Sequence, residues 1–144
     1  MTLEPKEHKL TEEELLKIRY TNLKAKTSYS LGAGVGLVKD HLKYSIKKGH
    51  EGTTIVDNGV MMASLDLYNQ AQDSKTLEKY GYKGKKFPSV MGASLYITED
   101  TNVKTKQNKA SNITIYVKNE QGYKNACYLT SIGSVKEKFY SIPR

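Results

Sequence analysis

Three kinds of residue are scarce in this 144-residue chain: tryptophan is absent, cysteine occurs once, and arginine occurs only as Arg19 and Arg144. The single cysteine, Cys127, excludes an internal disulfide. With two arginines among 23 basic residues, the other 21 are lysines. Lysine is a mobile point charge, whereas arginine is the planar fork that reads bases and phosphates bidentately. The basic character therefore favours tolerant contact with a polyanion over sequence-specific recognition.

Long apolar segments are also missing. No run is long enough to span a bilayer, and the first residues lack the apolar stretch of a signal peptide. We therefore expect an intracellular, cytoplasmic protein that makes no membrane contact. The hydrophobic fraction of 38% is low for a globular protein and predicts a modest core with polar loops.

Recognisable catalytic and metal-binding motifs are absent as well. The three histidines, His8, His41 and His50, do not have the spacing of a zinc site, and no G-x-S-x-G motif or nuclease-type acid pattern occurs. The sequence predicts no metal, no cofactor and no enzymatic activity. Gly32, Gly34 and Gly36 match neither the dinucleotide fingerprint nor a Walker A loop, so a connector or tight packing is favoured over a phosphate cradle.

What the chain does have is a strong positive charge, a formal +8. Residues 1–14 hold five glutamates and only two lysines, so the positive charge is concentrated in the rest of the chain. A basic body favours an anionic partner, either nucleic acid or an acidic protein surface.

Two segments have helical patterns. Thr11 and Glu14 form a capping box, and apolar residues at helical spacing predict a helix from about Glu12 to about Lys26. An apolar stripe along residues 37–48, followed by Gly49, favours a second helix, although alternation within the same residues also fits a strand. A further one or two helical turns are expected in residues 74–80.

The remainder reads as strands. One hairpin is expected from residues 53–56 and 60–68 around the turn 57–59, and a second from residues 112–118 and 123–132. Two single strands are expected, at residues 93–97 and, as a short edge strand, 135–142. The predicted fold class is α+β: one or two N-terminal helices followed by an antiparallel sheet of about five strands, with an open OB-like barrel as a variant. Residues 1–10 are expected to form a flexible leader, and residues 11–144 a single domain.

One loop combines positive charge with aromatic rings, as proteins that bind single strands do. Its candidate binding residues are Tyr80, Tyr82, Lys83, Lys85, Lys86 and Phe87. A second basic stretch adds Lys104, Lys106 and Lys109. The alternative is a solvated loop in which Tyr82 and Phe87 pack back onto the core.

These features predict a small non-enzymatic protein that binds nucleic acid with loose sequence preference, single strands being favoured. A phage or other mobile element is the suggested origin, with the host cytoplasm as its location. The alternative is a protein-interaction module, either a viral structural subunit or a small inhibitor of a host enzyme, because exposed tyrosines serve protein contacts equally well. Such a module could form a homo-oligomer.

Overall fold

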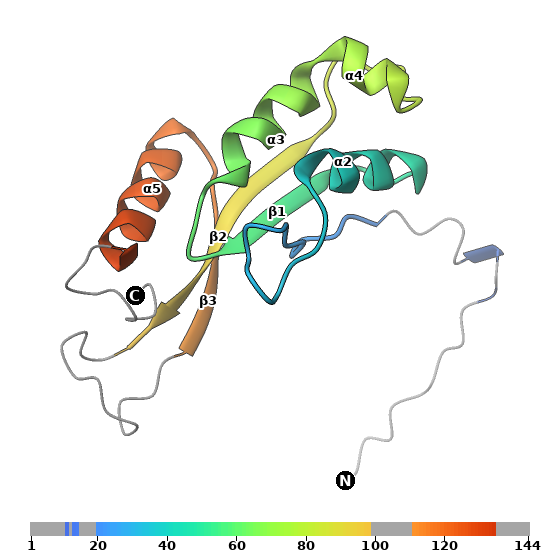
Figure 1. Ribbon diagram of the computed structural model, residues 1–144. Coiled ribbons are helices and arrows are strands. Elements are labelled where there is room, and N and C mark those ends of the chain that lie inside the picture. The colour runs from blue at the N-terminus through green and yellow to red at the C-terminus, as the bar shows by residue number, and fades with distance from the viewer. Residues whose placement is uncertain (1–10, 12, 15–19, 99–110, 135–144) are drawn as a thin grey trace, which may run out of the picture.

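A three-stranded sheet organises the fold in the computed structural model, which describes residues 11, 13–14, 20–98 and 111–134 (Figure 1). The strands are β1 (Thr53–Asn58), β2 (Ser89–Ile97) and β3 (Ser111–Tyr116), in the order β1-β2-β3. β1 and β2 run parallel, and β2 and β3 run antiparallel. The sheet is therefore mixed, and the expected antiparallel sheet of about five strands is wrong.

Two helices carry the chain from β1 to β2. They are α3 (Ala63–Gln72) and α4 (Ser74–Lys79), of which the second was expected and the first was not. Residues 60–68 had been assigned to a hairpin strand, but α3 begins among them. The turn at 57–59 does not reverse the chain into a hairpin; instead it leads into a crossover, and a crossover is what a parallel strand pair requires. The result is a β-α-β unit, so an OB-like barrel is excluded for the described residues.

The helix expected within residues 37–48 is confirmed as α2 (Val38–Lys47). The Asp40 carboxylate accepts the Leu37 N–H at 3.0 Å, which satisfies one free donor at the helix start. Gly49 follows the helix with φ +69°, a conformation that glycine adopts without the steric cost of a side chain.

Two small apolar clusters form part of the core. One contains Val38, Ile55, Ala63 and Leu67, with Met91 packed against it. The other contains Leu42, Leu77 and Phe87, with Ile46, Tyr80 and Tyr82 packed against it. Since α2 contributes to both clusters, it ties the crossover helices to the loop that precedes β2.

The C-terminal part of the described chain is a helix, α5 (Glu120–Ser134), where a hairpin strand at 123–132 had been expected. Its buried residues are Ala126, Thr130 and Gly133, which recur at helical rather than alternating spacing. Their side chains are small, so they give a weak hydrophobic pattern in the sequence. Asn119 caps the helix by accepting the Gly122 N–H at 2.9 Å.

Of the first expected helix, the structure describes residues 13–14, which are helical, and the residues from Tyr20 onward. Thr11 and Glu14 make both capping-box bonds, at 2.9 and 3.3 Å between backbone nitrogen and side-chain oxygen. From Tyr20 to Lys26 the chain is not helical; instead Ala25 forms a parallel bridge with Ile55 of β1. The predicted leader at 1–10 and the edge strand at 135–142 lie outside the described residues.

Candidate functional site

A buried carboxylate lies near the carboxyl end of β1. Asp57 is only 1% exposed, and its carboxylate accepts the Thr27 N–H at 2.7 Å, the Thr27 hydroxyl at 2.8 Å and the Ser30 hydroxyl at 2.6 Å. The Ser30 oxygen in turn accepts the Asn58 N–H at 2.9 Å. We call Thr27, Ser30, Asp57 and Asn58 the Asp57 clasp. Each carboxylate oxygen is thus occupied by a donor from the protein itself, and the clasp joins residues 27–30 to the end of the strand.

The clasp was missed in the sequence because its members are about 30 residues apart. One available signal was the position of Asp57 directly after the apolar pair Ile55 and Val56. A polar residue at the carboxyl end of a buried parallel strand is where ligand sites of open α/β sheets occur.

The glycine-rich segment 31–36 is positioned by the clasp. A side chain at Gly34 would bring its Cβ to 2.0 Å from the Thr27 carbonyl oxygen, so only glycine fits there. The Gly34 N–H also donates to the Ser30 carbonyl at 2.9 Å. Gly34 therefore serves close backbone packing, which is the interpretation favoured from the sequence over a phosphate cradle.

The two described histidines are engaged with the protein. His41 Nε2 lies 3.0 Å from the Val35 carbonyl oxygen. The His50 ring makes edge-to-face contacts with Tyr20 and Tyr44, at centroid distances of 5.2 and 5.9 Å. Among the described residues, neither histidine belongs to a group of three His, Cys, Asp or Glu side chains that could hold a metal ion.

Residues 80–87, which we call the basic loop, connect α4 to β2. Lys83, Lys85 and Lys86 are exposed. Phe87 is 4% exposed and lies in the core, and Tyr82 meets it edge to face at 5.1 Å. The loop therefore presents its lysines to solvent and turns Tyr82 and Phe87 inward, which is the alternative arrangement considered from the sequence. Tyr80 packs against the same cluster, and Lys104, Lys106 and Lys109 lie outside the described residues.

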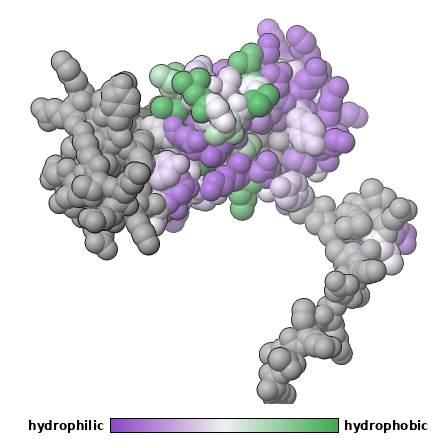
Figure 2. Space-filling model, turned by 60° about the horizontal axis from the view of Figure 1, so that its bottom comes forward, coloured by the Kyte–Doolittle hydropathy of each residue, from purple (hydrophilic) through white to green (hydrophobic). Residues whose placement is uncertain are grey.

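Large apolar side chains are exposed in the loops at the carboxyl end of β1. Leu31 is 92% exposed, Val35 86% and Met62 66%. In Figure 2, apolar residues gather in patches between hydrophilic ones on the face shown. No described helix is long and apolar enough to cross a membrane.

The family model of the PHP domain matches residues 22–144, which is most of the chain. The chain belongs to the PHP domain family. This membership and the mixed β-α-β sheet together replace the expected α+β fold with its antiparallel sheet. The matched residues include the clasp, the basic loop and α5.

Relatives of this PHP domain include alpha subunits of bacterial DNA polymerase III. The subunit of Helicobacter pylori is 29% identical over 126 residues, covering 87% of this chain and 9% of the relative. Those of Campylobacter jejuni and Borreliella burgdorferi are 26% and 28% identical, covering 85% and 88% of this chain and 9% and 10% of the relatives. The chain thus spans about a tenth of the length of these relatives.

A solved structure from Bifidobacterium adolescentis, described as that of a suggested metal-dependent phosphoesterase, is 12% identical with a TM-score of 0.48. The alignment covers 79% of this chain and 32% of the other.

The described residues do not present the ligand set of a metal site. Among them, no three His, Cys, Asp or Glu side chains are grouped so that they could hold a metal ion. Asp57, the buried carboxylate, has donors on both oxygens, and His41 lies against a carbonyl oxygen. We therefore derive no chemical step through a metal at these residues.

Family membership corrects several expectations from the sequence. The chain is not a small non-enzymatic viral protein, because it is a PHP domain whose relatives are subunits of a bacterial polymerase. The prediction of no enzymatic role is wrong for the same reason, and the phage, mobile-element and single-strand-binding descriptions have no support. The misinterpretation arose because lysine and tyrosine content reports surface composition and carries little information about fold.

Proposed function

We propose that this chain serves bacterial DNA synthesis, as a PHP domain of the kind found in DNA polymerase III alpha subunits, and that it associates with DNA. The observation that carries the proposal is the extent of the similarity, which covers 87% of the chain in the Helicobacter pylori subunit. A cytoplasmic location, where bacterial DNA is replicated, accords with this role.

The charge supports association with DNA. The formal net charge is +8, and the exposed lysines of the basic loop stand together next to α4. Lysine-phosphate contacts release counterions from DNA and give affinity without sequence preference. We assign the DNA contact to Lys83, Lys85 and Lys86; the rings of Tyr82 and Phe87 serve as the packed base of the loop. Lys104, Lys106 and Lys109 remain candidates for the same contact.

A chimeric polymerase tests the proposed role. The matching segment of the Helicobacter pylori alpha subunit would be replaced by this chain, and primer extension would be compared with the intact subunit and with a subunit lacking the segment. We expect the chimera to extend primers well above the deletion. A chimera that melts cooperatively and yet is as inactive as the deletion would contradict the proposal.

Binding to DNA is measured separately, with the isolated chain and fluorescently labelled single-stranded, duplex and primed DNA. We expect affinity to fall steeply as salt rises, because each neutralised phosphate contributes a slope of about −0.7 to −0.9 in a plot of log K against log salt. The comparison of the three substrates also decides whether one form is preferred. Absence of binding to all three at low salt would remove DNA as a direct partner.

A further inference from the structure

A hollow with a volume of about 770 Å³ lies between α3 and α5, above β2. We call it the α3–α5 groove. Tyr68 of α3, Met91 of β2 and Tyr123 of α5 are among the residues that line it. Its volume is within the range of about 300–1,000 Å³ that is typical of small-molecule sites.

The groove exists because α3 and α5 each pack on β2 without meeting each other closely. Figure 1 shows α5 standing to one side of the sheet and α3 above it. Phe87, Met91 and Val117 supply apolar lining. On the α3 side, Leu65 is 64% exposed and Tyr68 is 50% exposed. An aromatic ring on α3 thus borders the groove and is open to solvent.

A second ring lines the groove from α5. The neighbouring Cys127 side chain, one helical turn further on, and burial together raise the pKa of Tyr123. Tyr68 of α3 and Tyr123 of α5 thus line the groove from two helices, and aromatic rings of this kind can stack on a flat aromatic group.

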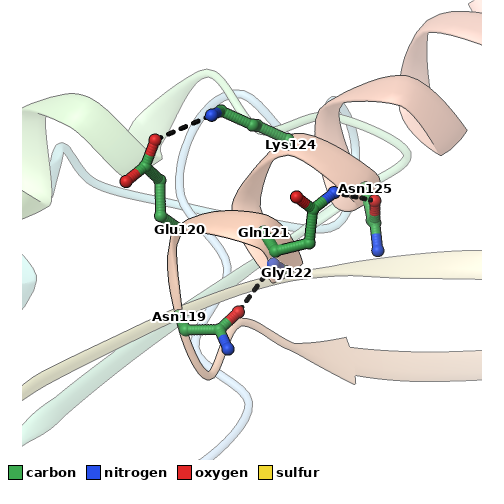
Figure 3. Close-up of polar contacts among 6 residues, drawn as sticks. All are labelled: Asn119, Glu120, Gln121, Gly122, Lys124 and Asn125. Atoms are coloured by element: carbon green, nitrogen blue, oxygen red, sulfur yellow. Dashed lines mark hydrogen bonds and ion pairs between the residues drawn. The ribbon is translucent and has the colours of Figure 1, made fainter.

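The charge at the groove is positive. Lys86 and Lys118 line it, and neither forms an ion pair with a carboxylate of the described residues. Glu120 also lines the groove, but its carboxylate lies 2.7 Å from Lys124 Nζ, so its charge is already matched (Figure 3). Two unmatched ammonium groups beside an apolar, aromatic hollow suit a ligand that has both a ring and an anionic group.

We propose that the α3–α5 groove binds a nucleotide, with the base between Tyr68 and Tyr123 and the phosphate near Lys86 and Lys118. The choice of a nucleotide among anionic aromatic ligands rests on the proposed role in DNA synthesis. The nucleotide has two potential sources: a free deoxynucleotide, or the terminal nucleotide of a DNA strand. The groove is distinct from the Asp57 clasp and needs no metal.

Titration calorimetry with the isolated chain tests the site, using deoxyadenosine, dAMP and a 5′-phosphorylated trinucleotide as probes. We expect saturable binding of dAMP and weaker binding of deoxyadenosine, which lacks the phosphate. Tighter binding of the trinucleotide than of dAMP would identify a strand end as the source, and the reverse would identify the free nucleotide. No saturable binding of any probe would overturn the proposal.

Matched variants separate the groove from the general surface. Tyr68→Ala should weaken dAMP binding about tenfold, from the loss of one stacking contact, while Tyr68→Phe should keep it. Lys118→Gln should weaken dAMP but leave deoxyadenosine unchanged. Tyr128→Ala, which alters a 66% exposed tyrosine of α5 that does not line the groove, is the control. Equal losses in Tyr68→Ala and Tyr128→Ala would overturn the site.

The two proposals fail separately. In one case the chimera extends primers normally when it carries Tyr68→Ala, and the isolated chain does not bind dAMP. That result would overturn the nucleotide site in the groove and leave the role in DNA synthesis standing. An inactive chimera together with dAMP binding that depends on Tyr68 would overturn the role and leave the groove.

Discussion

At the scale of single residues, Asp57 connects segments that lie about 30 residues apart in the sequence. Thr27 and Ser30 precede α2 in the chain, and β1 follows it. Three hydrogen bonds of 2.6 to 2.8 Å to Asp57 hold the two residues against β1. Hydrogen bonds to a charged acceptor are about twice as strong as neutral ones. A carboxylate with this many partners is therefore a structural anchor of the segment that precedes α2.

Removing the Asp57 side chain should destabilise the fold strongly. In Asp57→Ala three buried donors lose their acceptor, and each unsatisfied donor costs about 1–3 kcal/mol, so we expect a loss of about 3 kcal/mol or more in urea unfolding. Asp57→Asn keeps one carbonyl oxygen and should cost less. Glu78→Ala, at an exposed helical carboxylate, is the control and should change stability by less than about 0.5 kcal/mol. Equal effects of the Asp57→Ala and Glu78→Ala changes would refute the anchoring role.

Gly34 and Gly32 differ in a way that one substitution can test. Gly34→Ala places a methyl group 2.0 Å from the Thr27 carbonyl oxygen, so the loop must move, whereas Gly32→Ala meets nothing within 4 Å and suffers only from its φ of +72°. We expect Gly32→Ala to cost about 1 kcal/mol and Gly34→Ala clearly more, measured as thermal unfolding of both variants in parallel. The reverse order would show that packing against Thr27 is loose.

At the scale of elements, the sequence predicts what depends on near neighbours and misses what depends on distant ones. α2 and α4 were expected because their spacing and capping residues are local signals. β2 and β3 were expected in part from residues 93–97 and 112–118. The parallel pairing of β1 with β2 joins Thr53 to Ser89, across two helices, and no short-range pattern encodes such a pair.

The candidate site follows the same rule. The exposed lysines of the basic loop were identified from the sequence because charge is visible residue by residue. The burial of Phe87 beside Leu42 and Leu77 was not decided by the sequence, since it depends on how α2 and α4 pack. The α3–α5 groove could not be predicted, because α5 was assigned to a strand.

The cap of α5 gives the helix assignment a direct test. Asn119→Ala removes the acceptor of the Gly122 N–H and should cost about 1 kcal/mol in urea unfolding. Asn125 lies on the exposed surface of the same helix, so Asn125→Ala should change the free energy of unfolding only a little. If residues 123–132 formed a strand instead, the two substitutions would not differ in this way.

The start of α4 should respond to acid. Hydrogen bonding to the Thr76 side chain lowers the pKa of Asp73 below its ordinary value. A carboxylate whose pKa is depressed in the folded state stabilises that state above its unfolded pKa, and this contribution is lost as the pH falls through the folded pKa. We expect an NMR titration of Asp73 to shift upward in Thr76→Val. An unchanged titration would exclude Thr76 as the cause.

At the scale of the whole molecule, the distribution of charge matters more than its total. The +8 net charge could act diffusely or through one region. Only the basic loop, among the described segments, places three exposed lysines within four consecutive positions, at Lys83, Lys85 and Lys86. We expect a local arrangement of this kind to contact neighbouring phosphates of one strand more readily than dispersed lysines do.

Two triple variants of equal charge separate these cases. Changing Lys83, Lys85 and Lys86 to Gln should weaken DNA binding and reduce the salt slope by roughly 2 to 3, as phosphate contacts are lost. The second variant changes Lys39, Lys43 and Lys47 of α2, which are also exposed, to Gln and so removes the same charge. We expect it to reduce DNA affinity and the salt slope less than the first variant does. Equal loss of affinity in the two variants would mean that binding depends on net charge alone.

The Asp57 clasp also has a consequence for hydrogen-deuterium exchange. The amide protons of Thr27 and Asn58 are bound to side-chain oxygens of the clasp, at 2.7 and 2.9 Å, and Thr27 belongs to neither a helix nor one of the three strands. Exchange at such a position requires the clasp to open. The Thr27 amide, in a segment that reads as a loop, should therefore retain its proton as long as the amides of β1 do.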